Sequence, residues 1–391
     1  MKNLPHIHPY RSRESGVVSI FIVIFFMIFM SVIVVGFVKT VNDDQAQATD
    51  SDLSASALAS AQSGAEDGKR VLLLCKTPAT PAIAAACATV LTNPACSAVT
   101  SNATLVDSLN IDVDTAGGRS DGIVSGNSEY QQRYTCMTIK TKTSSVEGLS
   151  VAKNASELIP LTADGGTFDS VQFSWHATAE TRDGALTAFR TINPLGLPAQ
   201  DQWKNASGAS YAAAMRLEFI AYPKTGVNLN TLDADTRTVL LLPGSASTPV
   251  ATINLNALDI RDTNPSTATE YSPQLVRCQA TGEYGCTSRI QLAGTPSPAT
   301  YSYFLRVSSL YSSAYIKAEL KNAAGGIVQF DNVQPVIDVT GRANDVFRRI
   351  QTRVQYDASM YLPQYAVEVN SLCKNMTVTD VNATSSDVCN P

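Results

Sequence analysis

The residue types that carry most enzyme chemistry are scarce and scattered in this 391-residue chain. Only three histidines occur: His6 and His8 near the N-terminus, and His176 in the body. A Ser/His/Asp or Cys/His site would have to use one of them, and no G-x-S-x-G sequence is present. His176 alternates out of register with Phe173 and Trp175, so we expect it to face solvent from a strand. The sequence therefore predicts neither an enzyme nor a cofactor.

Carboxylates that could bind calcium occur in two stretches. One holds Asp112, Asp114 and Asp121, and the other holds Asp233 and Asp235. Neither stretch follows the D-x-[DN]-x-[DN]-G loop with a closing glutamate. No cysteines and histidines cluster at the short spacing that zinc requires. We interpret these aspartates as turn residues and predict no metal site.

Eight cysteines offer the most definite chemistry, and all of them follow residue 74. None forms a C-x-x-C pair. An even number of cysteines in an exported chain indicates disulfides, although some could remain buried thiols. Proximity in the sequence pairs Cys278 with Cys286 and Cys373 with Cys389.

The four remaining cysteines are ambiguous, because sequence alone does not fix connectivity. Our expectation is that Cys87 pairs with Cys96, and Cys75 with Cys136.

The densest basic group consists of Arg342, Arg348, Arg349 and Arg353. It could contact DNA, or it could be the solvated face of a strand with acidic partners on neighbouring strands. Only 16% of the residues are charged, and the net charge is −5. An acidic chain is a poor general binder of phosphate backbones, so we favour the second interpretation and expect no nucleic-acid partner.

An unbroken apolar run from Val17 to Val38 precedes all of these residues. Its 22 residues would span about 33 Å as a helix, enough to cross a bilayer. Basic residues before it and acidic residues after it predict a cytoplasmic N-terminus and an external body. These residues are Lys2, Arg11 and Arg13 before the run, and Asp43 and Asp44 after it.

Two other interpretations of the run stay open. A cleaved signal peptide would fit a signal-peptidase site at Ala46-Gln47-Ala48, but its apolar region usually has only about 7–15 residues. A simple signal anchor is the second.

The helical pattern continues beyond the run, through residues 39–74. Small and apolar residues recur every three or four positions there, which marks one face of a helix. They are Leu53, Ala57, Ala61, Ala65, Gly68 and Leu72. We predict one long helix over 17–74, with its second half covered by the chain's own sheet.

The N-terminus resembles type IV prepilins, in particular the PilX-type minor pilins. The resemblance rests on a short charged leader ending in Glu14-Ser15-Gly16, followed at once by the apolar run. It implies that prepilin peptidase cuts between Gly16 and Val17 and methylates Val17. Most pilins carry glutamate at the fifth mature position, whereas this chain has Phe21 there. PilX-type proteins often lack that glutamate, and its absence argues against the most abundant subunit.

The body after the helix falls into two expected segments. Residues 75–165 are rich in small polar residues and predict a loop-rich, disulfide-pinned insert with a short helix near 82–91. Residues 166–391 show two-residue alternation broken by turn residues, which predicts eight to eleven antiparallel strands. Residues 337–349 resemble the closing strands of PilX-type proteins, and Cys373–Cys389 resembles the C-terminal cystine loop of pilins.

The expected fold class is therefore α+β, with a leader over 1–16 and a long helix packed on a β-sheet body. The resemblance implies a structural pilus subunit that sits in the cytoplasmic membrane before assembly and in an extracellular pilus afterwards. Its implied partners are other pilin subunits, prepilin peptidase and the inner-membrane assembly platform. The body could add adhesion. A type II secretion pseudopilin and a signal-anchored extracellular binding protein are the alternatives.

Overall fold

The computed structural model divides the chain into two compact units. Unit 1 combines residues 1–140 with 336–352, and unit 2 combines 141–335 with 353–391. These bounds differ from the division at residue 165 that composition suggested, because two long strands, β3 and β17, each contribute to both units. The structure describes residues 15–115, 120–124, 132–177, 188–189, 203, 209–226, 236–245, 252–255, 273–279, 281–292, 294 and 296–355.

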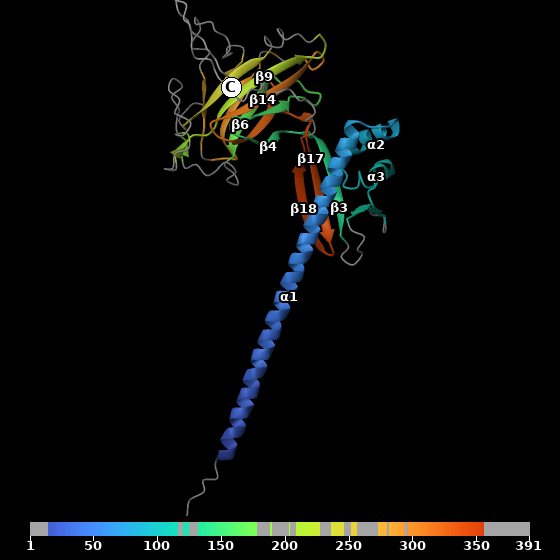
Figure 1. The fold of residues 1–391 in the computed structure, drawn as a ribbon, viewed down its shortest axis with the longest axis vertical. Helices are drawn as coiled ribbons and strands as arrows, with labels where there is room; N and C mark the ends of the chain where they lie inside the picture. The colour runs from blue at the N-terminus through green and yellow to red at the C-terminus, as the bar shows by residue number, and fades with distance from the viewer. Residues whose placement is uncertain are drawn as a thin grey trace, which may run out of the picture. The chain divides into compact units, whose positions relative to one another are not determined.

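Unit 1 is built on α1, a single helix over Ser15–Lys76 (Figure 1). Its 62 residues contain no proline, which would interrupt the hydrogen-bond ladder. The expected long helix is therefore confirmed.

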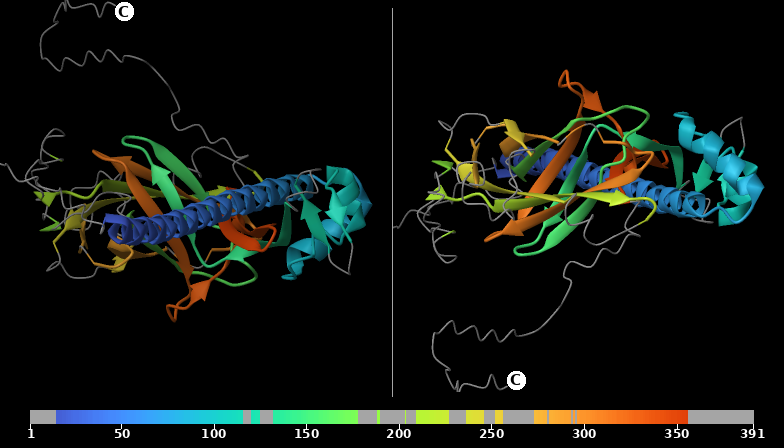
Figure 2. Two further views of the ribbon diagram at one scale, coloured as in Figure 1. Left: turned by 90° about the horizontal axis from the view of Figure 1, so that it is seen from below. Right: turned by 90° about the horizontal axis from the view of Figure 1, so that it is seen from above.

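Two short helices, α2 (Pro81–Thr92) and α3 (Ala103–Leu109), flank the C-terminal end of α1 (Figure 2). Side chains cap both N-termini: the Thr80 hydroxyl accepts from the Ile83 N–H, and the Asn102 side chain accepts from the Leu105 N–H. The helix expected near residues 82–91 is α2.

A five-stranded sheet runs in the order β1-β2-β3-β17-β18. Its strands are β1 (Val113–Asp114), β2 (Asp121–Ile123), β3 (Arg133–Thr143), β17 (Phe330–Ala343) and β18 (Val346–Arg353). The segment over residues 75–165, which we expected to be loop-rich, contributes β1, β2 and β3 to this sheet. Four threonines and one isoleucine, all β-branched, favour the extended conformation of β3 over its eleven residues.

Unit 2 is a β-sandwich of two further sheets. One has the order β12-β10-β9-β14-β5, and the other has the order β11-β13-β6-β15-β16 with β4 also paired to β15. The first comprises β5 (Ser156–Pro160), β9 (Ala214–Pro223), β10 (Arg237–Gly244), β12 (Gln274–Arg277) and β14 (Tyr301–Leu310). The second comprises β4 (Val146–Val151), β6 (Ser170–Ala177), β11 (Thr252–Asn254), β13 (Tyr284–Gln291), β15 (Ala314–Lys321) and β16 (Ile327–Val328).

Three strand pairs in unit 2 are parallel, whereas we expected antiparallel strands. The pairs β10–β12 and β11–β13 are parallel, so the body is mixed and mostly antiparallel. A further two-residue pair, β7 (Ala188–Phe189) with β8 (Ala209–Ser210), is also parallel. The fold is thus of the α+β class.

Alternating residues form the core of unit 2. Val171, Phe173 and Trp175 on β6 are fully buried, as their spacing predicts, and the Trp175 indole donates to the Ala213 carbonyl at 2.9 Å. His176 corrects the sequence expectation, because it is only 5% exposed. Its φ of +65° interrupts the two-residue alternation that had placed it on a solvent face.

Three disulfides occur among the described residues. Cys278–Cys286 confirms its predicted pairing. The other two are Cys75–Cys87 and Cys96–Cys136, so the expected pairs Cys87–Cys96 and Cys75–Cys136 are wrong. Cys373 and Cys389 lie outside the described residues.

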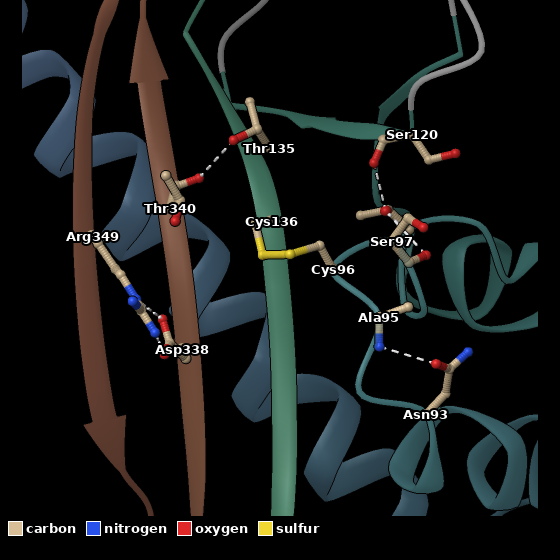
Figure 3. Close-up of a disulfide and its surroundings, with 11 residues drawn as sticks. Asn93, Ala95, Cys96, Ser97, Ser120, Thr135, Cys136, Asp338, Thr340 and Arg349 are labelled. Carbon is tan, nitrogen blue, oxygen red and sulfur yellow. Dashed lines mark hydrogen bonds and ion pairs between the residues drawn. A yellow bond between two sulfur atoms is a disulfide. The ribbon is translucent and has the colours of Figure 1, made fainter.

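The pairing error has a geometric cause. Helix α2 carries Cys87 back beside the last turn of α1, where its Cα lies 5.5 Å from that of Cys75. Cys96 follows α2 and meets β3 at Cys136 (Figure 3). Short separation in the sequence is a poor guide to pairing here, because Cys87 lies on α2 and faces α1, whereas Cys96 lies beyond the end of α2.

Candidate assembly surface on the long helix

The N-terminal half of α1 presents a bare apolar surface. Every large apolar side chain from Ile20 to Val38 is between 48% and 69% exposed. Ser31, the polar residue in this stretch, donates to the Met27 carbonyl at 2.7 Å and so satisfies its hydroxyl within the helix. By length and composition, α1 could cross a membrane, which fits a membrane anchor or a signal sequence.

The C-terminal half of α1 is covered by protein. Ala57, Ala61, Ala65 and Leu72 are at most 4% exposed, which confirms the small-residue face predicted from the sequence. Ser60 lies on the same side and is fully buried, with its hydroxyl donating to the Ser56 carbonyl at 2.9 Å. This half therefore needs no further partner on that face.

Glycines set how closely β17 approaches α1. A Cβ on Gly341 of β17 would lie 2.1 Å from the Ala57 carbonyl oxygen and 2.3 Å from the Ala61 nitrogen, so this position is closed to any side chain. On the helix side, Cβ atoms on Gly64 and Gly68 would each lie 2.7 Å from a methyl group of β17. The sequence pattern found Gly68 but missed Gly341; a glycine inside a strand is the signal that could have found it.

A buried polar contact fastens β3 to the helix. Tyr134 is 1% exposed, and its hydroxyl donates to Asp67 Oδ2 at 3.0 Å. Asp67 also accepts from Arg70 at 3.0 Å, and Arg70 donates in turn to the Leu109 carbonyl at the end of α3. Burial, and then the negative charge of Asp67, raise the pKa of the Tyr134 phenol well above its usual value.

The arginine group lies on the β17–β18 hairpin and has acidic partners, as we favoured. Arg349 forms a two-pronged ion pair with Asp338 on β17, with Nε to Oδ1 at 2.7 Å (Figure 3). This hydrogen bond raises the pKa of the Arg349 guanidinium. Arg342 lies over the Phe347 ring at 5.4 Å and forms a 3.7 Å ion pair with Asp345.

The two other arginines of the group are also engaged. Arg348 donates to the Ser54 hydroxyl of α1 at 2.8 Å, which is a second fastening of the sheet to the helix. Arg353 is paired with Glu147 and donates to the Ser145 carbonyl at 3.1 Å. These contacts account for the basic cluster as part of the scaffold.

The first acidic stretch has a similar explanation. Arg133 pairs with Asp114 and lies 3.9 Å from Asp121, so a cation of the chain itself stands between these carboxylates. Within the described ranges, no group of three His, Cys, Asp or Glu side chains is placed to hold a metal ion. Asp233 and Asp235 lie outside those ranges.

The residues of the expected prepilin cleavage site occupy the start of α1. Gly16 and Val17 lie in its first turn, and Phe21 follows one turn later with 69% exposure. Most of the expected leader, residues 1–14, lies outside the described part of the chain.

No protein-family model, no curated protein sequence and no solved structure matches this chain.

Proposed function

We propose that this chain is a structural subunit of a type IV pilus, of the PilX-like minor pilin kind. The observation that carries the proposal is that one uninterrupted helix has two halves of opposite character. Residues 20–38 are apolar and bare, whereas the face of residues 57–72 is small and covered. The helix also begins beside the glycine at which the resemblance places the processing cut.

The bare half has a physical role at both stages of such a life cycle. Before assembly, lipid covers the apolar side chains. Removing apolar surface from water is favourable by about 25 cal/mol per Å2. During assembly, the same side chains exchange lipid for the helices of neighbouring subunits. Neither environment tolerates a charge, which agrees with an uncharged run from Val17 to Val38.

The covered half gives the body a firm attachment to the helix. Close packing at Gly341, the Tyr134–Asp67 hydrogen bond and the Arg348–Ser54 hydrogen bond all hold the sheet against α1. A subunit that is pulled through its helix would transmit that force to the sheet through these contacts. The proposed location is therefore the cytoplasmic membrane before assembly and the pilus surface afterwards.

The deciding experiment is the mass of the N-terminal peptide of the protein purified from its native host. The proposal expects a peptide that begins at methylated Val17. A Gly16→Val variant should keep its leader, whereas the neighbouring Ser15→Ala variant should still be cut. An intact Met1 in the wild type would refute the proposal and leave a membrane-anchored display protein. A start at Thr49 would indicate ordinary secretion.

A further inference from the structure

A pocket of about 330 Å3 lies at one end of the β-sandwich of unit 2. That volume falls in the range of sites that hold small molecules. Its floor is apolar and buried: Leu161, Phe219 and Leu255 are at most 7% exposed. The walls include two half-exposed tyrosines, Tyr301 and Tyr303, whose ring centroids lie 6.1 Å apart.

Strand register shows which residues of the sheet β12-β10-β9-β14-β5 face the core and which face the pocket. Directly paired residues of antiparallel strands point to the same face. In the core, Leu217 pairs with both Val239 and Val307, and all three are buried. Two residues toward the pocket, Phe219 pairs with Arg237, so the side chain of Arg237 leaves the sheet on the core-facing side, and Arg237 lines the pocket.

The next row toward the open end combines a large and a small side chain. Tyr303 pairs with Ala221, and both residues line the pocket. The methyl group of Ala221 leaves room that a larger residue would fill. An inward-facing cation beside an aromatic wall is an unusual end for a sandwich core, where charged groups are normally absent.

The second sheet supplies the opposite side of the pocket. Ile253 and Ile290 pair with each other and are buried in the core. Leu255 and Leu292 each come two residues after one of these isoleucines, just past the ends of β11 and β13, and both line the pocket. The cavity is therefore the place where the inner faces of both sheets continue beyond the filled core.

Hydrogen bonds hold one wall in place without a ligand. The Tyr303 hydroxyl accepts from the Ser297 N–H at 2.8 Å. Lys224 donates through its ammonium to the Pro298 carbonyl at 2.5 Å and through its backbone to the Thr300 carbonyl at 2.9 Å. A preformed wall lowers the ordering cost of binding.

We propose that this pocket binds a small aromatic carboxylate. The apolar floor would cover the ring, and the tyrosines would contact its faces and edges. Arg237 would pair with the carboxylate; its five donors allow this in addition to contacts with the protein. The inference concerns unit 2 and goes beyond the proposed pilus role, because it does not depend on processing at Gly16.

The probe is 3-phenylpropionate, titrated into the full chain in lipid nanodiscs and followed by calorimetry. Empty nanodiscs correct for partition into lipid. The neutral analogue 3-phenylpropanol has the same ring and chain but lacks the charge. We expect a dissociation constant on the order of 0.1–1 mM for the acid, and roughly tenfold or weaker binding of the alcohol.

Two substitutions locate the binding. Arg237→Gln should remove the preference for the acid over the alcohol. The matched control, Arg216→Gln, changes an arginine on β9 that is 43% exposed and does not line the pocket, and should keep the preference. Ala221→Phe should fill the cavity and abolish binding of both compounds.

Three results would overturn the inference: no binding of the acid by the wild type up to about 5 mM, equal binding of acid and alcohol, or an unchanged preference in Arg237→Gln. Should Arg237→Gln lower the melting temperature, the wild-type preference and the Ala221→Phe variant decide instead. Retained binding in Ala221→Phe would place the ligand elsewhere and refute the site.

Discussion

The two halves of α1 belong to one helix and one sequence, yet they meet different surroundings. The N-terminal half carries phenylalanine, isoleucine, valine and methionine, and all of these are about half exposed or more. The C-terminal half carries alanine, glycine and serine on its covered face, and those residues are almost completely buried. The large apolar side chains of residues 20–38 are thus left uncovered, whereas Leu72 near the other end of the helix is buried.

The small residues of the covered face have a structural consequence. Small residues let β17 approach the backbone of α1 at Gly341, where any side chain would collide. The bulky residues on the other half are left exposed by all of the described elements. Under the proposed function, lipid would cover these residues before assembly and other helices would cover them afterwards.

The largest expected effect comes from charging the bare half. Ile28→Asp should disfavour membrane insertion by about 2.5–3.5 kcal/mol, because a carboxylate would enter the hydrocarbon. The measurement is the share of the chain that stays in membranes after alkaline carbonate extraction. Leu58→Asp is the matched control, since Leu58 is a partly exposed leucine beyond the apolar run. Equal extraction of both variants would show that residues 20–38 are not embedded.

The second-largest effect should come from adding a side chain where β17 packs on the covered half of α1. Gly341→Ala places a Cβ against the backbone of Ala57 and Ala61, where no rotamer change can relieve the collision. We expect a loss of about 2–3 kcal/mol in the free energy of unfolding, which thermal melting of the full chain in detergent would show. Gly326→Ala, whose Cβ would meet the side chain of Asn322 instead, should cost less. An unchanged melting temperature for Gly341→Ala would mean that the sheet does not press on α1.

The Tyr134–Asp67 contact predicts a pH dependence on the covered half. The folded protein holds the phenol neutral, because its pKa is raised, whereas in the unfolded chain it ionises near pH 10. The neutral phenol therefore contributes its full stabilisation of the folded state below pH 10. As the pH rises above 10, the free energy of unfolding falls by about 1.4 kcal/mol per pH unit. Unfolding measured from pH 9 to 11 should show this slope in the wild type and a shallower one in Tyr134→Phe. Parallel slopes would contradict the buried, neutral phenol.

The smallest expected effect on stability comes from replacing one glycine in each half of α1 by alanine. A Cβ on Gly36 would meet nothing within 4 Å, whereas one on Gly64 would lie 2.7 Å from Val339. Gly36→Ala should therefore stabilise the helix by up to about 1 kcal/mol, and Gly64→Ala should destabilise the protein by about 1–2 kcal/mol. Amide hydrogen exchange along α1 would report both signs. A destabilising Gly36→Ala would reveal a packing partner for the bare half.

Local patterns in the sequence predicted the elements that periodicity controls. The long helix, the small-residue face through Ala57 and Ala61, and the alternating strand through Phe173 and Trp175 all follow from repeats of 3.6 or two residues. The acidic partner of Arg349 was expected on a neighbouring strand, although its identity was not.

Features that depend on three-dimensional neighbours were missed. The pairing of Cys75 with Cys87 requires α2 to fold back on α1, and the burial of His176 requires a positive φ. Gly341 stands out as a glycine inside a strand, but the close contact that it permits is with Ala57, some 280 residues earlier in the chain. The pocket beside Arg237 needs two sheets in register, which no single strand pattern contains.

The continuity of α1 between its two halves also fixes a length. From Val38, the last bare apolar residue, to Ala57, the first fully buried one, there are 19 residues of continuous helix, or about 28 Å. These residues are mostly polar and mostly exposed. On a membrane they would act as a rigid spacer, so that the nearest covered turn stands clear of the lipid headgroups. Deleting whole helical turns would shorten this stand-off without changing either surface that it separates.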